Sequence, residues 1–262
     1  MLYSQASQHL AHNPAQPVLV FLHGLLGCGK DWQQTIDYLS DYPSVCLDLP
    51  GHGLSGLNSC NNFKECCDQI SDTLLTQFEP HRPIVLIGYS MGGRIAMNGV
   101  VNNHFAGLNI QQLIVEGGNF GLPSPMDRAA RWEYDVQWAE RFTNQPIEQV
   151  LSDWYQQAVF SSLNHAQRQK LIAKRSANLG PQVANMMLAT SLAKQDYLLD
   201  ALSSSAVAVH YICGEKDDKF SQLAKRSGLS FSQVAEAGHN VHVEQPQAFA
   251  EIVKTQIKQT FV

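Results

Sequence analysis

The first 121 residues alternate between short apolar runs and segments with helical spacing. Aliphatic and β-branched runs predict strands at 17–22, 44–48, 83–87 and 113–116. Helical periodicity lies between these runs, at 31–39, at about 62–78 and from residue 93 onward. Strands that alternate with helices are typical of a parallel sheet covered by helices on both faces, so we predict an α/β fold.

The pattern changes after residue 121. Residues 122–202 carry only helical signals, and the strand pattern resumes at 206–213 and, more weakly, at 231–234, before a closing helix at 245–260. We therefore predict a core made of residues 1–121 and 203–262, with residues 122–202 inserted as a helical cap. Ligands in open α/β sheets bind at the carboxyl ends of the strands, so the cap should lie over these ends.

The pentapeptide Gly88-Tyr89-Ser90-Met91-Gly92 directly follows the apolar run at 83–87. A strand, a tight turn of small residues and a helix in this order lift the serine hydroxyl out of the sheet, which marks Ser90 as a reactive group. A phosphate-binding loop is the competing interpretation, but the chain has no G-x-x-x-x-G-K-[ST] pattern. We therefore favour a reactive serine.

Two later loops carry the acid and the base that an activated serine needs. Asp217 follows the strand predicted at 206–213, and His239 follows the last strand. The imidazole accepts the serine proton, and the carboxylate fixes its tautomer. Asp217 could instead cap the next helix, and Asp218 competes with it for the role of the acid. The chain order Ser90, Asp217, His239 resembles that of α/β-hydrolases.

The loop after the first core strand, His23-Gly24-Leu25, is placed to donate a backbone N–H to an oxyanion. In the α/β-hydrolase fold, which the chain resembles over nearly its whole length, the second donor is the amide after the serine. The expected donors here are Leu25 and Met91. Asp48 and His52, in the next loop, are interpreted as structural residues.

Composition narrows the class of protein. A net charge of −5 argues against nucleic-acid binding, and no run of about 18 apolar residues predicts a membrane span. The N-terminus has neither a basic nor an apolar signal region, and the six cysteines form no C-x-x-C pair and no ligand-like spacing with histidine. We expect a cytoplasmic protein with free thiols, no metal and no cofactor; no feature specifies its oligomeric state.

Arginines concentrate in the predicted cap, and Arg94 lies one helical turn after Ser90. Guanidinium groups bind carboxylates bidentately, which favours a polycarboxylate as the small-molecule substrate. Each arginine could equally be a solvated charge on a helix face. The arginines of the cap are Arg128, Arg131, Arg141, Arg168 and Arg175.

Several segments resemble the 2-succinyl-6-hydroxy-2,4-cyclohexadiene-1-carboxylate synthases of menaquinone biosynthesis, and two of them, Asp153–Gln157 and Glu116–Gly118, are not general hydrolase motifs. They include Gly88–Arg94, Val115-Glu116-Gly117-Gly118, Asp153-Trp154-Tyr155-Gln156-Gln157, Arg175-Ser176-Ala177-Asn178, Cys213–Asp217 and Ala237-Gly238-His239-Asn240. The resemblance implies a lyase that eliminates pyruvate from 2-succinyl-5-enolpyruvyl-6-hydroxy-3-cyclohexene-1-carboxylate. It assigns substrate binding to Arg94, Arg131, Arg175, Tyr89 and Trp154.

Two other functions use the same residues. A serine hydrolase of small acidic esters, or of carbon–carbon ring-cleavage products, would need the same triad and would show an acyl-enzyme burst with nitrophenyl esters. A ligand receptor built on a hydrolase scaffold could lose the triad without penalty, yet all three positions are intact. We expect Ser90, activated by His239 and Asp217, to act as a base in the lyase reaction.

Overall fold

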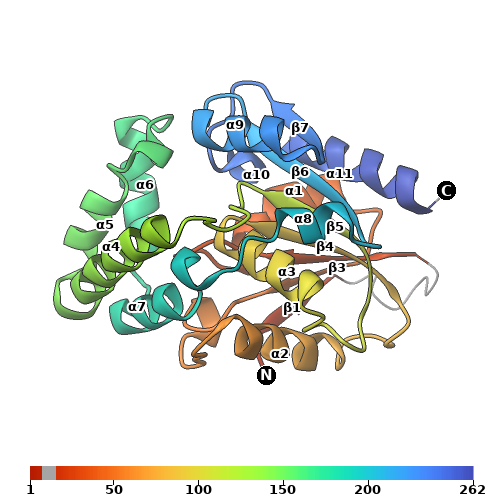
Figure 1. Ribbon diagram of the computed structural model, residues 1–262, viewed down its shortest axis with the longest axis horizontal. Helices are drawn as coiled ribbons and strands as arrows, with labels where there is room; N and C mark the ends of the chain where they lie inside the picture. Colours follow the sequence, from red (N-terminus) through yellow and green to blue (C-terminus); the bar gives the residue numbers. More distant parts are fainter. Residues whose placement is uncertain (8–15, 262) are drawn as a thin grey trace.

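The computed structural model describes residues 1–7 and 16–261 and contains a seven-stranded sheet (Figure 1). The strand order is β1-β3-β2-β4-β5-β6-β7; β1 pairs antiparallel to β3, and all other neighbours are parallel. This architecture confirms the predicted α/β fold. The strands are β1 Ser4–Ala6, β2 Val18–Leu22, β3 Ser44–Leu47, β4 Pro83–Tyr89, β5 Asn109–Glu116, β6 Ala208–Gly214 and β7 Ser230–Val234.

Two strands differ from the sequence prediction. Strand β1 is three residues long and two of them are polar, so it carries no recognisable alternation, and its antiparallel pairing with β3 comes from tertiary context. Strand β5 starts at Asn109 rather than at residue 113. Its first residues include polar side chains, but they pair with β4 and are therefore extended. Both differences lie at positions where strand pairing, and not apolar burial, selects the extended backbone.

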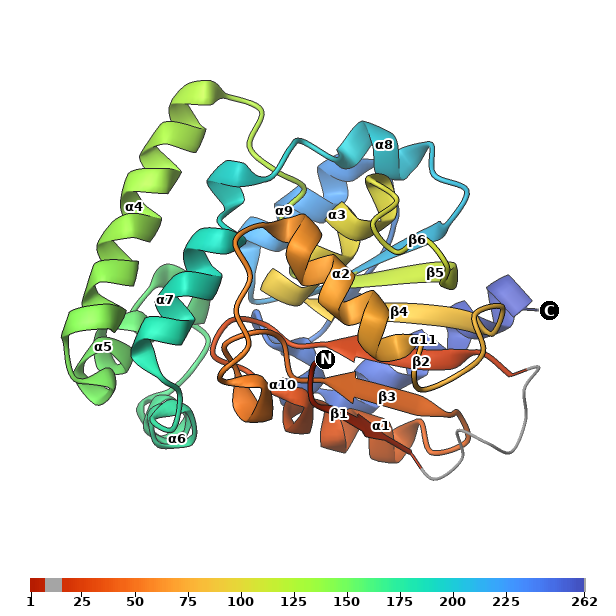
Figure 2. The ribbon, with the colours of Figure 1, turned by 90° about the horizontal axis from the view of Figure 1, so that it is seen from below.

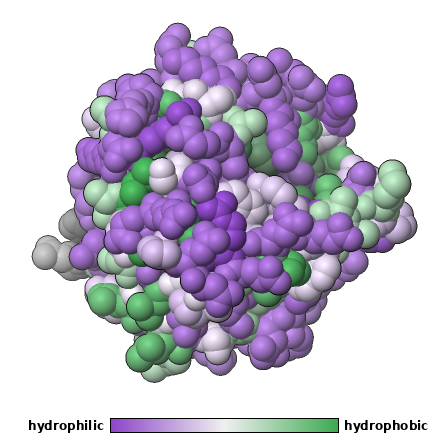
Figure 3. Space-filling view, turned by 90° about the vertical axis from the view of Figure 1, so that its left-hand side faces the viewer, coloured by the Kyte–Doolittle hydropathy of each residue, from purple (hydrophilic) through white to green (hydrophobic). Residues whose placement is uncertain are grey.

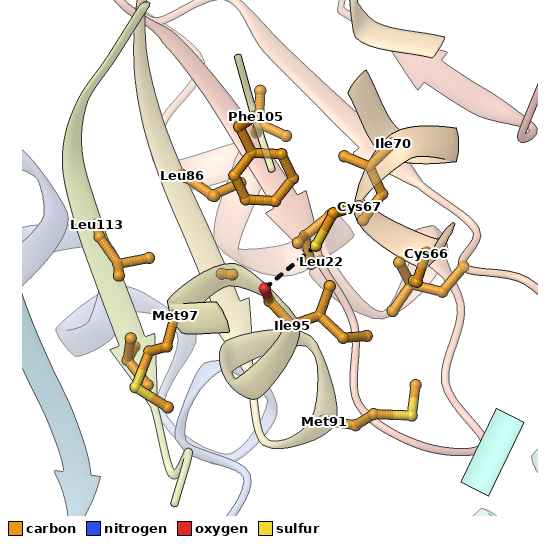
Figure 4. Close-up of a cluster of buried hydrophobic side chains, with 14 of the residues drawn as sticks. Leu22, Cys66, Cys67, Ile70, Leu86, Met91, Ile95, Met97, Phe105 and Leu113 are labelled. Atoms are coloured by element: carbon orange, nitrogen blue, oxygen red, sulfur yellow. Dashed lines mark hydrogen bonds between the residues drawn. The ribbon is translucent and has the colours of Figure 1, made fainter. Parts of the chain in front are cut away.

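Helices cover both faces of the sheet (Figure 2). Side chains of α2, α3 and α8 pack in one apolar cluster, and side chains of α1 and α11 pack in the other. Figure 4 shows part of the first cluster, where Phe105 lies beside Leu86 of β4 and Ile70 lies near Cys67. The helices are α1 Gln33–Tyr38, α2 Phe63–Leu74, α3 Met91–Val101, α8 Leu199–Ser203, α9 Asp218–Ser227, α10 Val241–Glu244 and α11 Pro246–Phe261.

A group of four helices stands at one end of the molecule (left in Figure 1). Its members are α4 Pro125–Asn144, α5 Ile147–Trp154, α6 His165–Arg175 and α7 Gly180–Ala189, and we refer to them as the helical group. They share a separate apolar cluster that includes Phe142, Leu151 and Val183. Figure 3 looks onto this end, where the surface is mostly hydrophilic and the apolar patches are separate.

The chain leaves for the helical group and returns from it at neighbouring points. The Leu198 N–H donates to the Phe120 carbonyl at 2.7 Å, and the Gln195 side-chain amide donates to the Asn119 carbonyl at 2.8 Å. Helix α8, which follows, packs against α3 beside the sheet. Within the described ranges, no helix has the length and apolar character required to cross a membrane.

Candidate active site

The parallel register brings the carboxyl ends of six strands, β2 to β7, to one edge of the sheet. Leu22 of β2 pairs with Gly88 of β4, and Gly214 of β6 pairs with Val234 of β7. Parallel strands end at the same edge, so the loops after them are neighbours. This alignment collects the His23–Leu25 loop, Ser90, Asp217 and His239 from distant parts of the chain.

The turn at Ser90 is sharp and strained. Ser90 has φ of 50°, a left-handed value that is uncommon for a residue with a side chain, and its N–H donates to the Glu116 carbonyl at 2.7 Å. A Cβ placed at Gly92 would lie 2.4 Å from the Leu22 carbonyl oxygen, so only glycine allows α3 to pass this close to β2. The predicted strand–turn–helix therefore has the geometry that exposes a serine hydroxyl.

The side chains of Ser90, His239 and Asp217 form a continuous hydrogen-bonded line. His239 Nδ1 lies 2.6 Å from Asp217 Oδ2, and His239 Nε2 lies 3.3 Å from Ser90 Oγ. The other oxygen of Asp217 accepts from the Phe220 N–H, so this residue also caps α9. Asp218 is exposed in the first turn of α9, and it is the Asp217 carboxylate that contacts the histidine.

The segment Glu116-Gly117-Gly118, at the end of β5, makes room for His239 and stabilises its loop. Gly117 has φ of 58°, and a Cβ there would lie 2.7 Å from Cε1 of His239. The buried Glu116 carboxylate accepts from His242, at 3.1 Å from its N–H and 2.7 Å from Nδ1. The His242 ring stacks on Trp32 at 3.8 Å. These contacts fix the loop that carries His239.

Two buried histidines brace the loop that holds Leu25. His23 Nε2 accepts from the Leu49 N–H, and His52 Nε2 accepts from the Leu26 N–H. Burial lowers the pKa of His23 to about 4 and that of His52 to about 3, so both rings are neutral acceptors near pH 7. Asp48 accepts from the amides of Gly29 and Leu54, which agrees with its interpretation as a structural residue.

Leu25 and Met91 face the same pocket as Ser90. Neither backbone amide donates to another group of the described chain, so both are available to a ligand. A Cβ placed at Gly24 would lie 3.5 Å from the Ser90 Cβ, which shows how close this loop comes to the serine. The two amides can therefore act on one oxygen atom near Ser90.

The pocket above Ser90 has a volume of about 1050 Å³ and extends between the sheet edge and the helical group. Its wall includes every predicted substrate-binding residue: Tyr89, Arg94, Arg131, Trp154 and Arg175. The remaining arginines of residues 122–202 do not line it. Arg141 pairs with Asp153 and lies over Trp138, and Arg168 donates to Gln156, so both serve contacts within the helical group. Arg128 is likewise absent from the wall.

Arg94 and Arg131 are held by the segment that leaves α7. Arg94 donates to the Thr190 carbonyl, and Arg131 Nε donates to Asp135 Oδ1 at 2.7 Å. The second oxygen of Asp135 accepts from the Ser191 hydroxyl at 2.7 Å. Burial, together with the charge of Arg131, lowers the pKa of Arg94 to about 9. Residues Thr190 and Ser191 therefore help to position both guanidinium groups, Arg94 directly and Arg131 through Asp135. Each guanidinium keeps further N–H groups that can bind a ligand.

Arg175 is held by a carboxylate of the core. Its Nη2 lies 2.7 Å from Asp31 Oδ2, and Lys174 Nζ lies 2.7 Å from Asp31 Oδ1. Burial alone would raise the pKa of Asp31, but Arg175 and Lys174 outweigh burial and hold it well below its usual range. This ionic contact fastens α6 of the helical group to the segment just after the Leu25 loop.

Sequence reasoning did not identify the supporting residues Asp31, Asp135, Ser191, Glu116 and His242. Each is an ordinary polar residue whose partner lies far away in the chain; 144 residues separate Asp31 from Arg175. Glu116 alone gave a local signal, because a carboxylate at the end of an apolar strand needs a buried partner.

Comparison with known proteins agrees with this geometry. The model of the alpha/beta hydrolase family matches residues 19–252. The 2-succinyl-6-hydroxy-2,4-cyclohexadiene-1-carboxylate synthase of Yersinia enterocolitica is 48% identical over 257 residues, covering 98% of this chain and 90% of that protein. The synthase of the same name from Pectobacterium atrosepticum is 45% identical over 248 residues, covering 94% and 96%.

Solved structures show the same relationship. The structure of MenH from S. aureus superposes with a TM-score of 0.88 at 26% identity and covers 99% of both chains. A thermophilic esterase from Thermogutta terrifontis superposes with a TM-score of 0.77 at 18% identity, covering 100% of this chain and 94% of that one, and shows the shared fold. These matches agree with the sharp strand–turn–helix at Ser90 and with the resemblance of the sequence. The chain therefore belongs to the 2-succinyl-6-hydroxy-2,4-cyclohexadiene-1-carboxylate synthase family of alpha/beta hydrolases.

Proposed function

We propose that this chain is a carbon–oxygen lyase of menaquinone biosynthesis. It eliminates pyruvate from 2-succinyl-5-enolpyruvyl-6-hydroxy-3-cyclohexene-1-carboxylate and leaves 2-succinyl-6-hydroxy-2,4-cyclohexadiene-1-carboxylate. The observation that carries the proposal is a pocket in which a serine–histidine–aspartate line faces three arginines. A tricarboxylate substrate matches such a wall, whereas an apolar ester would not.

The reaction begins at the ring carbon next to the succinyl ketone. Ser90 Oγ removes the proton from this carbon while His239 Nε2 accepts the serine proton, and Asp217 stabilises the resulting imidazolium. The electron pair of the broken C–H bond moves into the ketone as an enolate. The amides of Leu25 and Met91 donate to the enolate oxygen, a contribution on the order of 10²–10³ in rate for each donor.

The enolate then collapses through the ring. A double bond forms between the deprotonated ring carbon and the adjacent carbon of the existing ring double bond. That double bond shifts by one position, toward the carbon that carries the ether, and the ether C–O bond breaks. The enolpyruvate leaves with that electron pair, and the proton held by His239 is available to convert it to pyruvate. In this scheme the serine remains a base throughout and forms no covalent intermediate.

The helices α4–α7 act as a cap over the reaction, because they supply Arg131, Trp154 and Arg175 to the pocket wall. The residues named above cover both proton transfer and charge stabilisation, so we propose that no metal or organic cofactor takes part. Six unpaired thiols support a reducing, cytoplasmic compartment.

The test is an assay of the purified chain with the enolpyruvyl substrate, in which released pyruvate is measured. Wild type should release one pyruvate for each substrate molecule, and Ser90→Ala should reduce kcat by a factor of about 10³ or more. Intact pyruvate release in Ser90→Ala would refute the role of the serine. A burst of nitrophenolate from small acidic nitrophenyl esters, with no pyruvate from the enolpyruvyl substrate, would identify a hydrolase instead.

A further inference from the structure

Lys219 is a cation in the pocket wall for which the substrate-binding set above has no role. It lies at the second position of α9, two residues after Asp217, and lines the same pocket as Ser90 and Arg131. Its Nζ lies 5.3 Å from the centre of the Phe220 ring, and that ring packs 4.8 Å from the His239 ring. Across residues 1–7 and 16–261, no carboxylate lies within ion-pairing distance of Lys219.

This position is unfavourable for an ammonium group. The N-terminus of a helix carries partial positive charge, so a lysine there is destabilising, whereas Lys225 and Arg226 at the other end of α9 are well placed. The Lys219 side chain is exposed to the pocket, yet partial desolvation by the surrounding chain lowers its pKa, and the positive charge of Arg131 lowers the pKa further, against an opposing effect of Asp217. A cation held against these three effects in a pocket indicates a ligand of opposite charge.

The charges of the arginine network leave room for one more cation. Asp135 neutralises Arg131, and Asp31 neutralises one of the pair Arg175 and Lys174. The network that includes Arg94 therefore carries two net positive charges, although the proposed substrate has three carboxylates. Lys30, Lys170, Glu236 and Glu244 also line the pocket, and Lys219 differs from them in its place at the start of α9, two residues after Asp217. From there Lys219 supplies a further positive charge on the core side of the pocket.

We propose that Lys219 and Arg131 form a clamp that binds one carboxylate of the substrate between α9 and α4. Arg131 donates from Nε to Asp135, so its two terminal nitrogens can donate to the ligand. The clamp joins the helical group, which carries Arg131, to the core helix that Asp217 caps (both labelled in Figure 1). The inference rests on the proposed function, because that function supplies the tricarboxylate.

The first experiment measures binding without turnover. Calorimetry gives the Kd of the enolpyruvyl substrate for Ser90→Ala and for the same variant carrying Lys219→Met, which keeps the length of the side chain and removes its charge. Loss of a charged contact predicts a Kd about 10–100-fold higher. Lys225→Met on the same helix, at an exposed position away from the pocket, is the control and should leave Kd unchanged.

The second experiment uses the serine-containing chain. Lys219→Met should raise KM for pyruvate release about 10–100-fold with kcat changed by less than about threefold, and Lys219→Arg should recover most of the loss. An unchanged Kd in Lys219→Met, or a loss confined to kcat, would overturn the clamp, since the lysine would then act on Asp217 and not on the ligand.

These outcomes separate the two proposals. A wild-type chain that binds the substrate through Lys219 but releases no pyruvate would overturn the proposed function and support the clamp. Normal pyruvate release by the Lys219→Met variant, with an unchanged KM, would overturn the clamp alone. Failure of both Ser90→Ala and wild type to bind the substrate would overturn both.

Discussion

Replacing Asp31 by asparagine should destabilise the protein strongly, since this carboxylate supports two cations of the helical group. The Asp31 side chain is 5% exposed and the Arg175 side chain 9% exposed, so the substitution leaves a buried guanidinium without its counter-ion. Breaking such a buried pair costs about 3–5 kcal/mol. The Lys174 side chain is 47% exposed, and its contact adds less than about 1 kcal/mol.

We expect a loss near the lower value, about 3 kcal/mol, because the asparagine carbonyl can still accept one hydrogen bond. For a chain of this size such a loss corresponds to a fall in Tm of roughly 6–12 °C. Thermal unfolding followed by circular dichroism measures it. Asp37→Asn, on the exposed face of α1 nearby, removes the same charge and should shift Tm by less than about 2 °C.

The effect should depend on pH in one direction. The pKa of Asp31 is depressed in the folded chain, so its stabilising contribution is fully present above about pH 4, the ordinary pKa of an unfolded aspartate, and is lost as the pH falls below that value. The difference in Tm between wild type and Asp31→Asn should therefore shrink in acid. A Tm for Asp31→Asn equal to that of Asp37→Asn at pH 7 would refute the reasoning.

The remaining predictions concern the chemistry and its supports. Asp217→Asn should lower kcat for pyruvate release by about 10⁴, while Asp218→Asn should change it by less than about threefold; equal losses would contradict the observed pairing with His239. Ser191→Ala removes the hydroxyl that holds Asp135, so KM should rise about 3–10-fold with kcat nearly unchanged in steady-state assays, and an unaltered KM would show that Arg131 needs no such support.

The grouping of Ser90, Asp217 and His239 could be predicted from sequence, because each residue has a signal in its own neighbourhood of the chain. The strand before Ser90, the glycines around it and the loops after two later strands specify where the chain turns, and the order of the parallel strands then brings the loops together. The helical character of residues 122–202 was likewise visible in the spacing of its apolar residues.

The supports of the arginines could not be predicted in this way. Asp31 and Arg175 lie 144 residues apart, and Asp135 and Ser191 lie 56 apart, so neither pair has a sequence signal before the fold is known. Lys219 has no sequence signal either, because a lysine two residues after Asp217 does not differ in sequence from a solvated helix residue. The short strand β1 was missed for a related reason, since pairing with β3 and not its own side chains makes it extended.

The hydrogen bond from Leu198 to the Phe120 carbonyl has an evolutionary consequence. The chain leaves for the helical group and returns from it at neighbouring residues, so a short turn of about two or three residues could replace everything between them without disturbing a strand. Lineages built on this sheet can therefore lengthen, exchange or delete the intervening helices while they retain the serine, histidine and aspartate. The residues that transfer protons and the helices that select the substrate can then change independently of each other.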